Sequence, residues 1–174
     1  MTLPAPDLND IRLLILDVDG VLTDGGIIIH SDGSESKRFN VLDGHRITMW
    51  HRAGLVTAIL SGRQTAATEI RAKELGVKYV MQGCKEKLPA FESLLEAGGF
   101  TLSQTACVGD DIVDLPVLTR VAFAATVPQA PEQVRAAAHY VATRPAGHGA
   151  VAEIIEYLLN KTNRWSELMK RYNI

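Results

Sequence analysis

The stretch LLILDVDGVLT, residues 13–23, decides the fold of this chain. Its first four residues are apolar and predict a strand buried on both faces, as in a parallel sheet. Asp17 and Asp19 follow at the end of that strand, and Gly20 comes directly after them. Ligands of open parallel sheets bind at this edge, and neighbouring carboxylates there repel each other unless a cation or a reaction partner joins them. The motif therefore predicts an α/β protein with a site at Asp17 and Asp19.

Two other kinds of structure carry acidic residues next to a glycine: a calcium-binding loop and an acidic turn. A calcium-binding loop needs an oxygen ligand at its fifth position and a glycine at its sixth. Those positions hold Val21 and Leu22, so the calcium loop is excluded. This motif alone does not exclude the alternative that it is an acidic turn without a catalytic or binding role.

A second acidic cluster, TACVGDDIVD over residues 105–114, favours chemistry. It again begins as a short apolar strand, and Gly109 permits a tight turn. Asp110, Asp111 and Asp114 then open a predicted helix, where the helix dipole favours negative charge. Helix capping explains one of these acids well and three poorly. Carboxylates at two strand ends predict a shared divalent cation, and ligation by oxygen alone favours magnesium over zinc.

Two shorter signals lie between the acidic clusters. Ser61-Gly62-Arg63 follows a predicted strand, and its hydroxyl and amides could hold phosphate oxygens, although Ser-Gly is also an ordinary turn. Lys85 and Lys87 lie at a predicted helix start, where the dipole disfavours a lysine. Such a lysine is easier to explain if it points at an anion, with simple solvation as the alternative.

These motifs, in this order, resemble those of the haloacid dehalogenase superfamily of phosphohydrolases. Within its capless branch, the chain is most similar to the family of 3-deoxy-D-manno-octulosonate 8-phosphate (KDO 8-phosphate) phosphatases. The stretches that carry the resemblance are 13–25, 39–44, 61–63, 82–83, 108–114 and 147–151. The resemblance implies a phosphatase of lipopolysaccharide biosynthesis. The expected fold is a doubly wound, mostly parallel, Rossmann-like sheet with a projecting β-hairpin and no cap domain.

The resemblance also implies roles for individual residues. Asp17 is the expected nucleophile that forms an aspartyl-phosphate, and Asp19 the expected acid and base. Ser61 and Lys87 complete the expected catalytic set by offsetting phosphoryl charge. The family's Mg²⁺ is expected on Asp17, on the backbone carbonyl of Asp19, and on Asp110. Asp111 and Asp114 are expected to act through water or to orient other groups.

Substrate contacts follow from the same resemblance. Arg63 is expected to reach a sugar carboxylate, because a branch that acts on nine-carbon 9-phosphates typically has an acidic residue there. Leu42 and Ala152 depart from the family, which often has arginine at both positions, so the exact sugar stays open. The expected substrate-binding residues are Asp19, Asn40, Val41, Leu42, Asp43, Gly44, Arg63, Arg71 and Lys87.

The composition agrees with a single phosphohydrolase domain over residues 1–174. A net charge of −2 gives no electrostatic case for a nucleic-acid or membrane partner. The chain shows no signal peptide and no apolar run of membrane-spanning length. Two cysteines are too few for a disulfide framework, and Cys107 is expected in the core. These features predict a cytoplasmic protein.

Hydrophobic periodicity predicts the remaining elements. Three isoleucines precede Ser31-Asp32-Gly33, which predicts a hairpin over about residues 26–40. Late strands are expected at 121–125 and 140–141, and a polar tail at about 162–174. Helices are expected over about 43–53, 65–75 and 86–97, after residue 114, and over 150–161.

The interval between Asp17 and Ser61 is 61 − 17 = 44 residues, and a hairpin, a helix and a strand already fill it. No separate cap domain fits there or before Lys87, so something else must exclude water. The resemblance assigns that role to a neighbouring subunit, and we expect a homotetramer formed through the hairpins. The tail after Lys161 is expected either to reach a neighbour's site or to fray.

Other function classes are less consistent with the motifs. A receiver domain carries its phosphoacceptor after a middle strand, whereas here the Asp pair follows the first. A non-catalytic binding domain would be expected to lack one of the residues Asp17, Asp19, Lys87 or Asp110, and all are present. A macromolecular phosphoester would call for a basic patch, which the sequence does not offer.

The sequence also contains histidines and a tryptophan outside these motifs. Trp50 and His51 lie on a predicted helix and are expected at the surface or an interface. His148 lies between two glycines and is expected in a turn, with a substrate role as the alternative. His45 follows the 39–44 stretch. The sequence does not decide whether its side chain lines the site or lies outside it.

Overall fold

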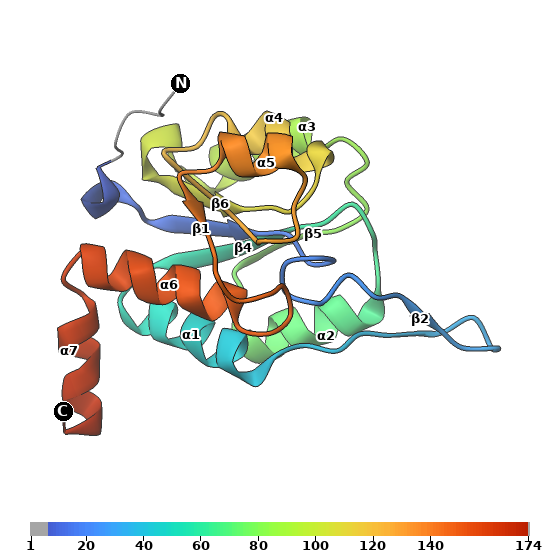
Figure 1. The fold of residues 1–174 in the computed structure, drawn as a ribbon, viewed down its shortest axis with the longest axis horizontal. Helices are drawn as coiled ribbons and strands as arrows, with labels where there is room; N and C mark the ends of the chain where they lie inside the picture. The colour runs from blue at the N-terminus through green and yellow to red at the C-terminus, as the bar shows by residue number, and fades with distance from the viewer. Residues whose placement is uncertain (1–6, 174) are drawn as a thin grey trace.

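The computed structural model describes residues 7–173, and within them six strands form one parallel sheet (Figure 1). Their order is β5-β4-β1-β6-β7-β8. The chain fills one side of β1 first and then crosses to the other side, so the strand order reverses at β1. Open α/β sheets bind ligands at such a switch point. The strands are β1 (Leu13–Leu16), β4 (Val56–Leu60), β5 (Tyr79–Met81), β6 (Thr105–Val108), β7 (Phe123–Thr126) and β8 (Tyr140–Val141).

Strand β1 lies at the centre because all four of its residues are apolar and fully buried. It pairs in parallel with β4 and β6, so that Leu16 lies opposite Ile59 and Val108. Strands in parallel register end at the same edge of the sheet. The segments that follow β1, β4 and β6 therefore leave the sheet side by side, as the sequence motifs predicted.

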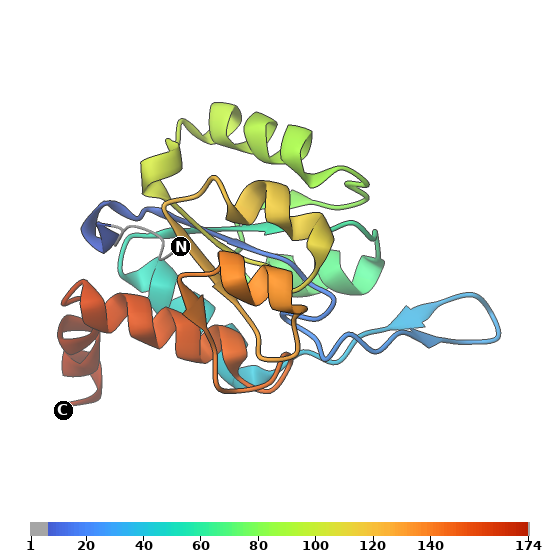
Figure 2. The same cartoon turned by 45° about the horizontal axis from the view of Figure 1, so that its top comes forward.

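Helices cover both faces of the sheet (Figures 1 and 2). One face carries α1 (Val41–Arg52), α2 (Ala66–Leu75) and α6 (Ala150–Lys161), and the other carries α3 (Lys87–Gly98), α4 (Leu115–Leu118) and α5 (Glu132–Ala137). The predicted apolar stripe of α6 is confirmed, because all five of its large apolar residues are buried. None of the helices in the described range combines the length and hydropathy needed to cross a bilayer.

The predicted hairpin is present but shorter than expected. Strands β2 (Ile28–Ile29) and β3 (Glu35–Ser36) pair antiparallel and project far from the sheet (Figure 2). Ile27, Ile28 and Ile29 remain 49%, 51% and 68% exposed. The chain itself therefore leaves this apolar strand uncovered.

The C-terminal tail is helical and packed. Helix α7 (Trp165–Met169) and the 3₁₀ turn Lys170–Tyr172 follow α6. The Tyr172 hydroxyl lies 3.0 Å from Nε2 of His45 in α1. The Arg46 guanidinium lies 5.4 Å from the centre of the Trp165 ring. Within one chain the tail thus packs on α1.

Three details differ from the sequence-based expectations. Trp50 is 1% exposed, and its indole N–H donates to the Val56 carbonyl at 3.0 Å, so its expected surface position was wrong. The indole can lie in the core because this bond satisfies its donor. His51 is half-buried and bonds the Thr57 hydroxyl. Helix α5, which was not expected, begins directly after Pro131.

A loop near the end of the sheet is fixed by Gly147, whose φ is +65°. Its N–H donates to the Val21 carbonyl at 3.2 Å, and its carbonyl accepts from the Asn40 amide at 3.2 Å. A Cβ at Gly147 would lie 2.5 Å from the Asp24 nitrogen. The loop is thereby held against the segment that follows Asp19.

We predict that Gly147→Ala lowers the free energy of unfolding by about 2–5 kcal/mol, through left-handed strain plus overpacking. Gly54→Ala is the matched control, because Gly54 has φ +76° with no heavy atom within 4 Å of its added Cβ. It should cost only about 1–2 kcal/mol. Urea unfolding of both variants measures the difference, and equal losses would show that the close approach at Gly147 is unimportant.

Candidate active site

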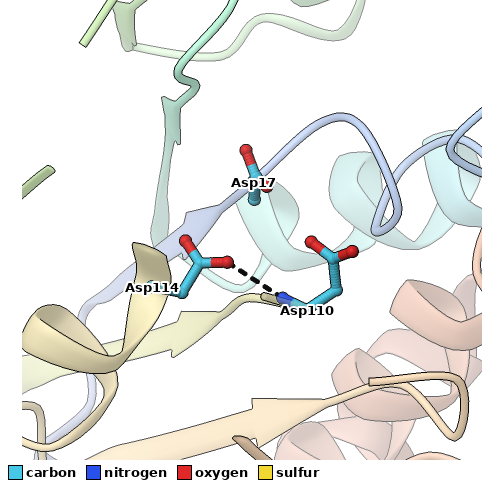
Figure 3. Close-up of side chains that lie close together, drawn as sticks. All are labelled: Asp17, Asp110 and Asp114. Carbon is cyan, nitrogen blue, oxygen red and sulfur yellow. Dashed lines mark hydrogen bonds between the residues drawn. The ribbon is translucent and has the colours of Figure 1, made fainter. Parts of the chain in front are cut away.

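Three carboxylates meet at the edge of the sheet where the strand order reverses. Asp17 follows β1, Asp110 follows β6, and Asp114 ends the 3₁₀ turn Ile112–Asp114. One oxygen from each lies within 4.8 Å of the others (Figure 3). Oxygen-only donors at this spacing fit a small divalent cation. The structure thus brings together the two acidic motifs that the sequence placed on separate strands.

Lys87, the first residue of α3, lies against this cluster. Its Nζ is 3.0 Å from Oδ1 of Asp17 and 2.5 Å from Oδ1 of Asp114, and its side chain is 3% exposed. Burial acts to lower the pKa of the Lys87 ammonium, but the two carboxylates outweigh burial and raise it. The ammonium is therefore charged at neutral pH. Simple solvation, the alternative considered for this lysine, does not apply.

One ammonium does not neutralise three carboxylates. Burial, with repulsion from Asp114 added and Lys87 opposing, raises the pKa of Asp17 to about 6. Burial and repulsion from Asp17 and Asp114 raise the pKa of Asp110 to about 7. The cluster therefore favours either a bound proton or a bound cation. This deficit of positive charge is the electrostatic reason that the site fits a divalent metal.

Close packing of the backbone shapes the cluster. Oδ2 of Asp114 accepts the N–H groups of Asp110 at 3.0 Å and Asp111 at 3.2 Å. A Cβ at Gly109 would lie 2.5 Å from the Asp114 side chain, and one at Gly20 would lie 2.0 Å from Oδ2 of Asp110. Both glycines are thus required by the approach of a carboxylate. Asp114 orients the Asp110 turn in addition to joining the cluster.

Asp19 lies beside the cluster between two cations. The Lys37 ammonium contacts Oδ1 of Asp19, and Nε of Arg63 lies 3.7 Å from Oδ2. Arg63 also donates to Glu35 at 2.7 Å. Oδ2 of Asp19 is itself buried without a hydrogen bond. The hairpin strand β3 and the loop after β4 thus converge on Asp19.

Ser61 lies directly after β4, the strand beside β1. It is 2% exposed. Its N–H donates to the Met81 carbonyl at 2.9 Å, and its carbonyl accepts from Cys84 at 3.0 Å. These bonds hold its backbone at the same edge of the sheet as Asp17, while they leave its hydroxyl available to a ligand.

The first turn of α1 carries five of the expected substrate contacts. Asn40 caps the helix and bonds Gly147. Val41 and Leu42 are exposed. Asp43 is buried, and its Oδ1 accepts the Ala152 N–H at 2.7 Å, at the start of α6. Burial raises the pKa of Asp43, although the N–H of Ala152 opposes the shift. In this structure Asp43 therefore anchors α6 to α1.

Arg71 packs across the same turn. A Cβ at Gly44 would lie 2.3 Å from an Arg71 nitrogen, so this glycine makes room for the guanidinium. Arg71 also pairs with Glu74 at 2.8 Å, and its Nε is buried without a hydrogen bond. His45 contacts Tyr172 of the tail, and His148 bonds the Ala146 carbonyl at 2.9 Å. The contacts of His45 thus lie on the tail side of α1.

Sequence analysis missed the contacts of Lys37 and Glu35. Both residues lie in the hairpin, which was recognised from its turn and its isoleucines. The available signal was their i, i+2 spacing, which would place both side chains on one face of an extended segment. That spacing does not say which partner the face meets, because the path of the hairpin relative to the sheet is a tertiary property.

Comparison with known proteins gives consistent matches. Residues 79–155 match the profile of a family described as haloacid dehalogenase-like hydrolase. The chain is 41% identical over 151 residues to the 3-deoxy-D-manno-octulosonate 8-phosphate phosphatase of Escherichia coli. This alignment covers 87% of this chain and 80% of the relative. The enzyme of Yersinia pestis is 39% identical over 150 residues, covering 86% and 80%.

Solved structures give the same result. The phosphatase of this name from Moraxella catarrhalis, in complex with magnesium, phosphate and KDO, superimposes with a TM-score of 0.92 at 38% identity. The alignment covers 95% of both chains. The cobalt-bound phosphatase from Haemophilus influenzae has a TM-score of 0.86 at 37% identity, covering 90% of this chain and 91% of the other.

The raised pKa of Asp110 generates a stability prediction for the metal-free protein. An ordinary Asp titrates near 3.8, and Asp110 in the folded state near 7. Between these values the folded state holds a proton that the unfolded state has lost, so stability falls as pH rises through this window. At pH above 7 the full repulsion is present. Removing the charge should then stabilise the fold.

We predict that Asp110→Asn raises the Tm by about 3–8 °C over wild type at pH 7.5 in EDTA, with the gap closing toward pH 4. Magnesium should raise the Tm of the wild type and leave that of the variant nearly unchanged. Differential scanning fluorimetry across pH, with and without magnesium, measures both effects. A lower Tm for the variant in EDTA at pH 7.5 would contradict the charge deficit.

Proposed function

The chain belongs to the 3-deoxy-D-manno-octulosonate 8-phosphate phosphatase family of the haloacid dehalogenase-like hydrolases, and we propose that it hydrolyses KDO 8-phosphate to KDO and phosphate. It is a phosphatase. The observation that carries the proposal is the convergence of Asp17, Asp110, Asp114 and Lys87 at the sheet edge, beside Asp19. We assign the reaction to lipopolysaccharide biosynthesis, as the resemblance of the sequence implies.

Magnesium is the proposed cofactor. Asp17, the backbone carbonyl of Asp19 and Asp110 would hold it, and the close cluster of carboxylate oxygens together with the raised pKa values of Asp17 and Asp110 supports this fit. Bound magnesium supplies positive charge that stabilises the transferring phosphoryl group. The Moraxella catarrhalis relative was solved with magnesium and phosphate present.

The residues of this chain divide the reaction into two steps. Asp17 attacks phosphorus and forms an aspartyl-phosphate, while Asp19 gives a proton to the departing sugar oxygen. Asp19 then takes a proton from the water that cleaves the acyl phosphate. Lys87 holds Asp17 at 3.0 Å and places a fixed positive charge next to the phosphoryl oxygens, with Ser61 as a hydroxyl donor.

Recognition of the sugar acid is proposed for the surface around Asp19 and the first turn of α1. Arg63 is 41% exposed on its side chain and lies 3.7 Å from Asp19, which suits a contact with the substrate carboxylate. Asn40, Val41, Leu42, Asp43, Gly44 and Arg71 complete the proposed set. The alternative substrate is a nine-carbon sugar-acid 9-phosphate, and Leu42 and Ala152 leave that possibility testable.

We expect kcat/KM for KDO 8-phosphate to exceed that for glucose 6-phosphate and for nine-carbon 9-phosphates by at least about 100-fold. Arg63→Ala should raise KM for the 8-phosphate about 10–100-fold, because it removes a charged hydrogen bond to the carboxylate. Phosphate release assays measure these values.

Two controls accompany the substrate panel. Asp17→Asn, which is nearly isosteric but not nucleophilic, should lower kcat by at least about 10³-fold. EDTA should abolish turnover, and magnesium should restore it. Preference for a nine-carbon substrate would identify the alternative function, and near-wild-type turnover in the Asp17→Asn protein would refute the mechanism.

A homotetramer is proposed as the active assembly. The exposed isoleucines of the hairpin and the exposed Val41 and Leu42 beside the site are apolar surfaces that this single chain does not cover. A two-stranded hairpin is marginal when isolated. We propose that hairpins of neighbouring subunits pack together, and that the tail after Lys161 helps to close a neighbour's site.

Light scattering should therefore give about four times the chain mass of 18.9 kDa. Truncation after Lys161 should change KM or kcat while the far-UV circular dichroism stays that of a folded protein. A second variant, Ile29→Lys, should dissociate the assembly because it places a charge on the apolar strand. A monomer with full activity would contradict the proposed assembly.

A further inference from the structure

Lys37 is a buried lysine that the catalytic steps above do not use. It follows β3 in the projecting hairpin, yet its side chain is only 3% exposed. Its ammonium forms an ion pair with Oδ1 of Asp19. An ammonium is seldom buried to this degree without a paired charge. The hairpin therefore places one buried ion pair, that of Lys37, on Asp19, the proposed proton donor.

The other oxygen of Asp19 is in a different situation. Oδ2 is buried and has no hydrogen-bond partner. Nε of Arg63 lies 3.7 Å from Oδ2, beyond hydrogen-bond distance. Arg63 is held instead by Glu35, at 2.7 Å. A buried carboxylate oxygen without a partner is costly unless a partner arrives during function.

Glu35 and Lys37 act from one short segment of the hairpin, because Glu35 lies in β3 and Lys37 directly follows that strand. This segment therefore carries both the anion that pairs with Arg63 and the cation that pairs with Asp19. Lys37 pairs with Oδ1 of Asp19, and Glu35 pairs with the Arg63 guanidinium, whose Nε stays 3.7 Å from Oδ2 of Asp19. The result is an asymmetric carboxylate with one oxygen fixed and the other available.

We infer that Lys37 is a positioning residue that fixes Asp19 for proton transfer, with Glu35 keeping the second Asp19 oxygen free. This inference rests on the proposed function, because it assigns Asp19 the transfer of a proton to the leaving group. The proton passes from Oδ2 of the protonated Asp19 carboxyl to the ester oxygen as the phosphorus–oxygen bond breaks, which leaves Asp19 as a carboxylate. Lys37 itself neither gains nor loses a proton.

Leaving groups that need a proton distinguish this role from a structural one. An aryl oxide that carries a nitro group departs without protonation, whereas an alkoxide needs a general acid. We use para-nitrophenyl, phenyl and benzyl phosphate, which are similar in size and lack carboxylates and sugar hydroxyls. The value kcat/KM reports steps up to departure of the leaving group, so hydrolysis of the aspartyl-phosphate does not mask the effect.

Lys37→Met should lower kcat/KM for benzyl phosphate about 100-fold and for para-nitrophenyl phosphate less than about 5-fold. Lys37→Arg, which retains a cation, should recover at least about tenfold of the loss on benzyl phosphate. Lys37→Gln is measured in parallel, so that the result does not depend on the folding of one variant. Arg38→Met is the matched control, because Arg38 is the next residue, its side chain is 69% exposed, and it pairs with Asp24.

A double variant tests whether Lys37 acts through Asp19. Combining Lys37→Met with Asp19→Asn should add less than about threefold to the loss caused by Asp19→Asn alone. Equal losses on all three esters would show a merely structural role and overturn the inference. So would a loss confined to KDO 8-phosphate, which would mark a direct substrate contact. A wild-type protein inactive on every phosphate ester would instead refute the proposed function.

Discussion

A single buried ammonium among three carboxylates organises the functional end of this molecule. Lys87 starts a helix, where the dipole opposes a cation, and it is held there by Asp17 and Asp114 at 3.0 and 2.5 Å. The two acids come from different strand ends, so the contact joins β1, the turn after β6 and the start of α3. Removing Lys87 would leave the buried carboxylates without their cation, which is a severe cost.

The same electrostatic cluster determines local shape. Its carboxylates approach so closely that Gly20 and Gly109 have no room for a Cβ beside Asp110 and Asp114. A motif that pairs acids with adjacent glycines therefore encodes charge and sterics together. This explains why the short motifs DxDG and GDD are informative. The glycine of the first motif makes room for Asp110 of the second, and the glycine of the second makes room for Asp114.

Much of this arrangement was predictable from local sequence. Four apolar residues before Asp17 were sufficient to place it at the end of a buried parallel strand, and the apolar stripe of α6 was predicted correctly. Lys37 was not predictable as a partner of Asp19, because the contact joins residues 18 apart through a hairpin whose direction depends on packing. Trp50 was misplaced for a similar reason, since the Val56 carbonyl that satisfies its indole lies beyond the end of the helix.

The hairpin contributes both to the proposed subunit contact and to the geometry around Asp19. Its exposed isoleucines need a covering surface, and its returning arm brings Lys37 to Asp19 and Glu35 to Arg63. A short projecting hairpin is too weakly stabilised by its own ladder to hold a side chain to the tolerance that proton transfer requires. The buried ion pair at Lys37 anchors the hairpin at its base, and cover over the isoleucines would steady it at its tip. In the proposed tetramer, assembly and acid–base geometry therefore depend on one segment of chain.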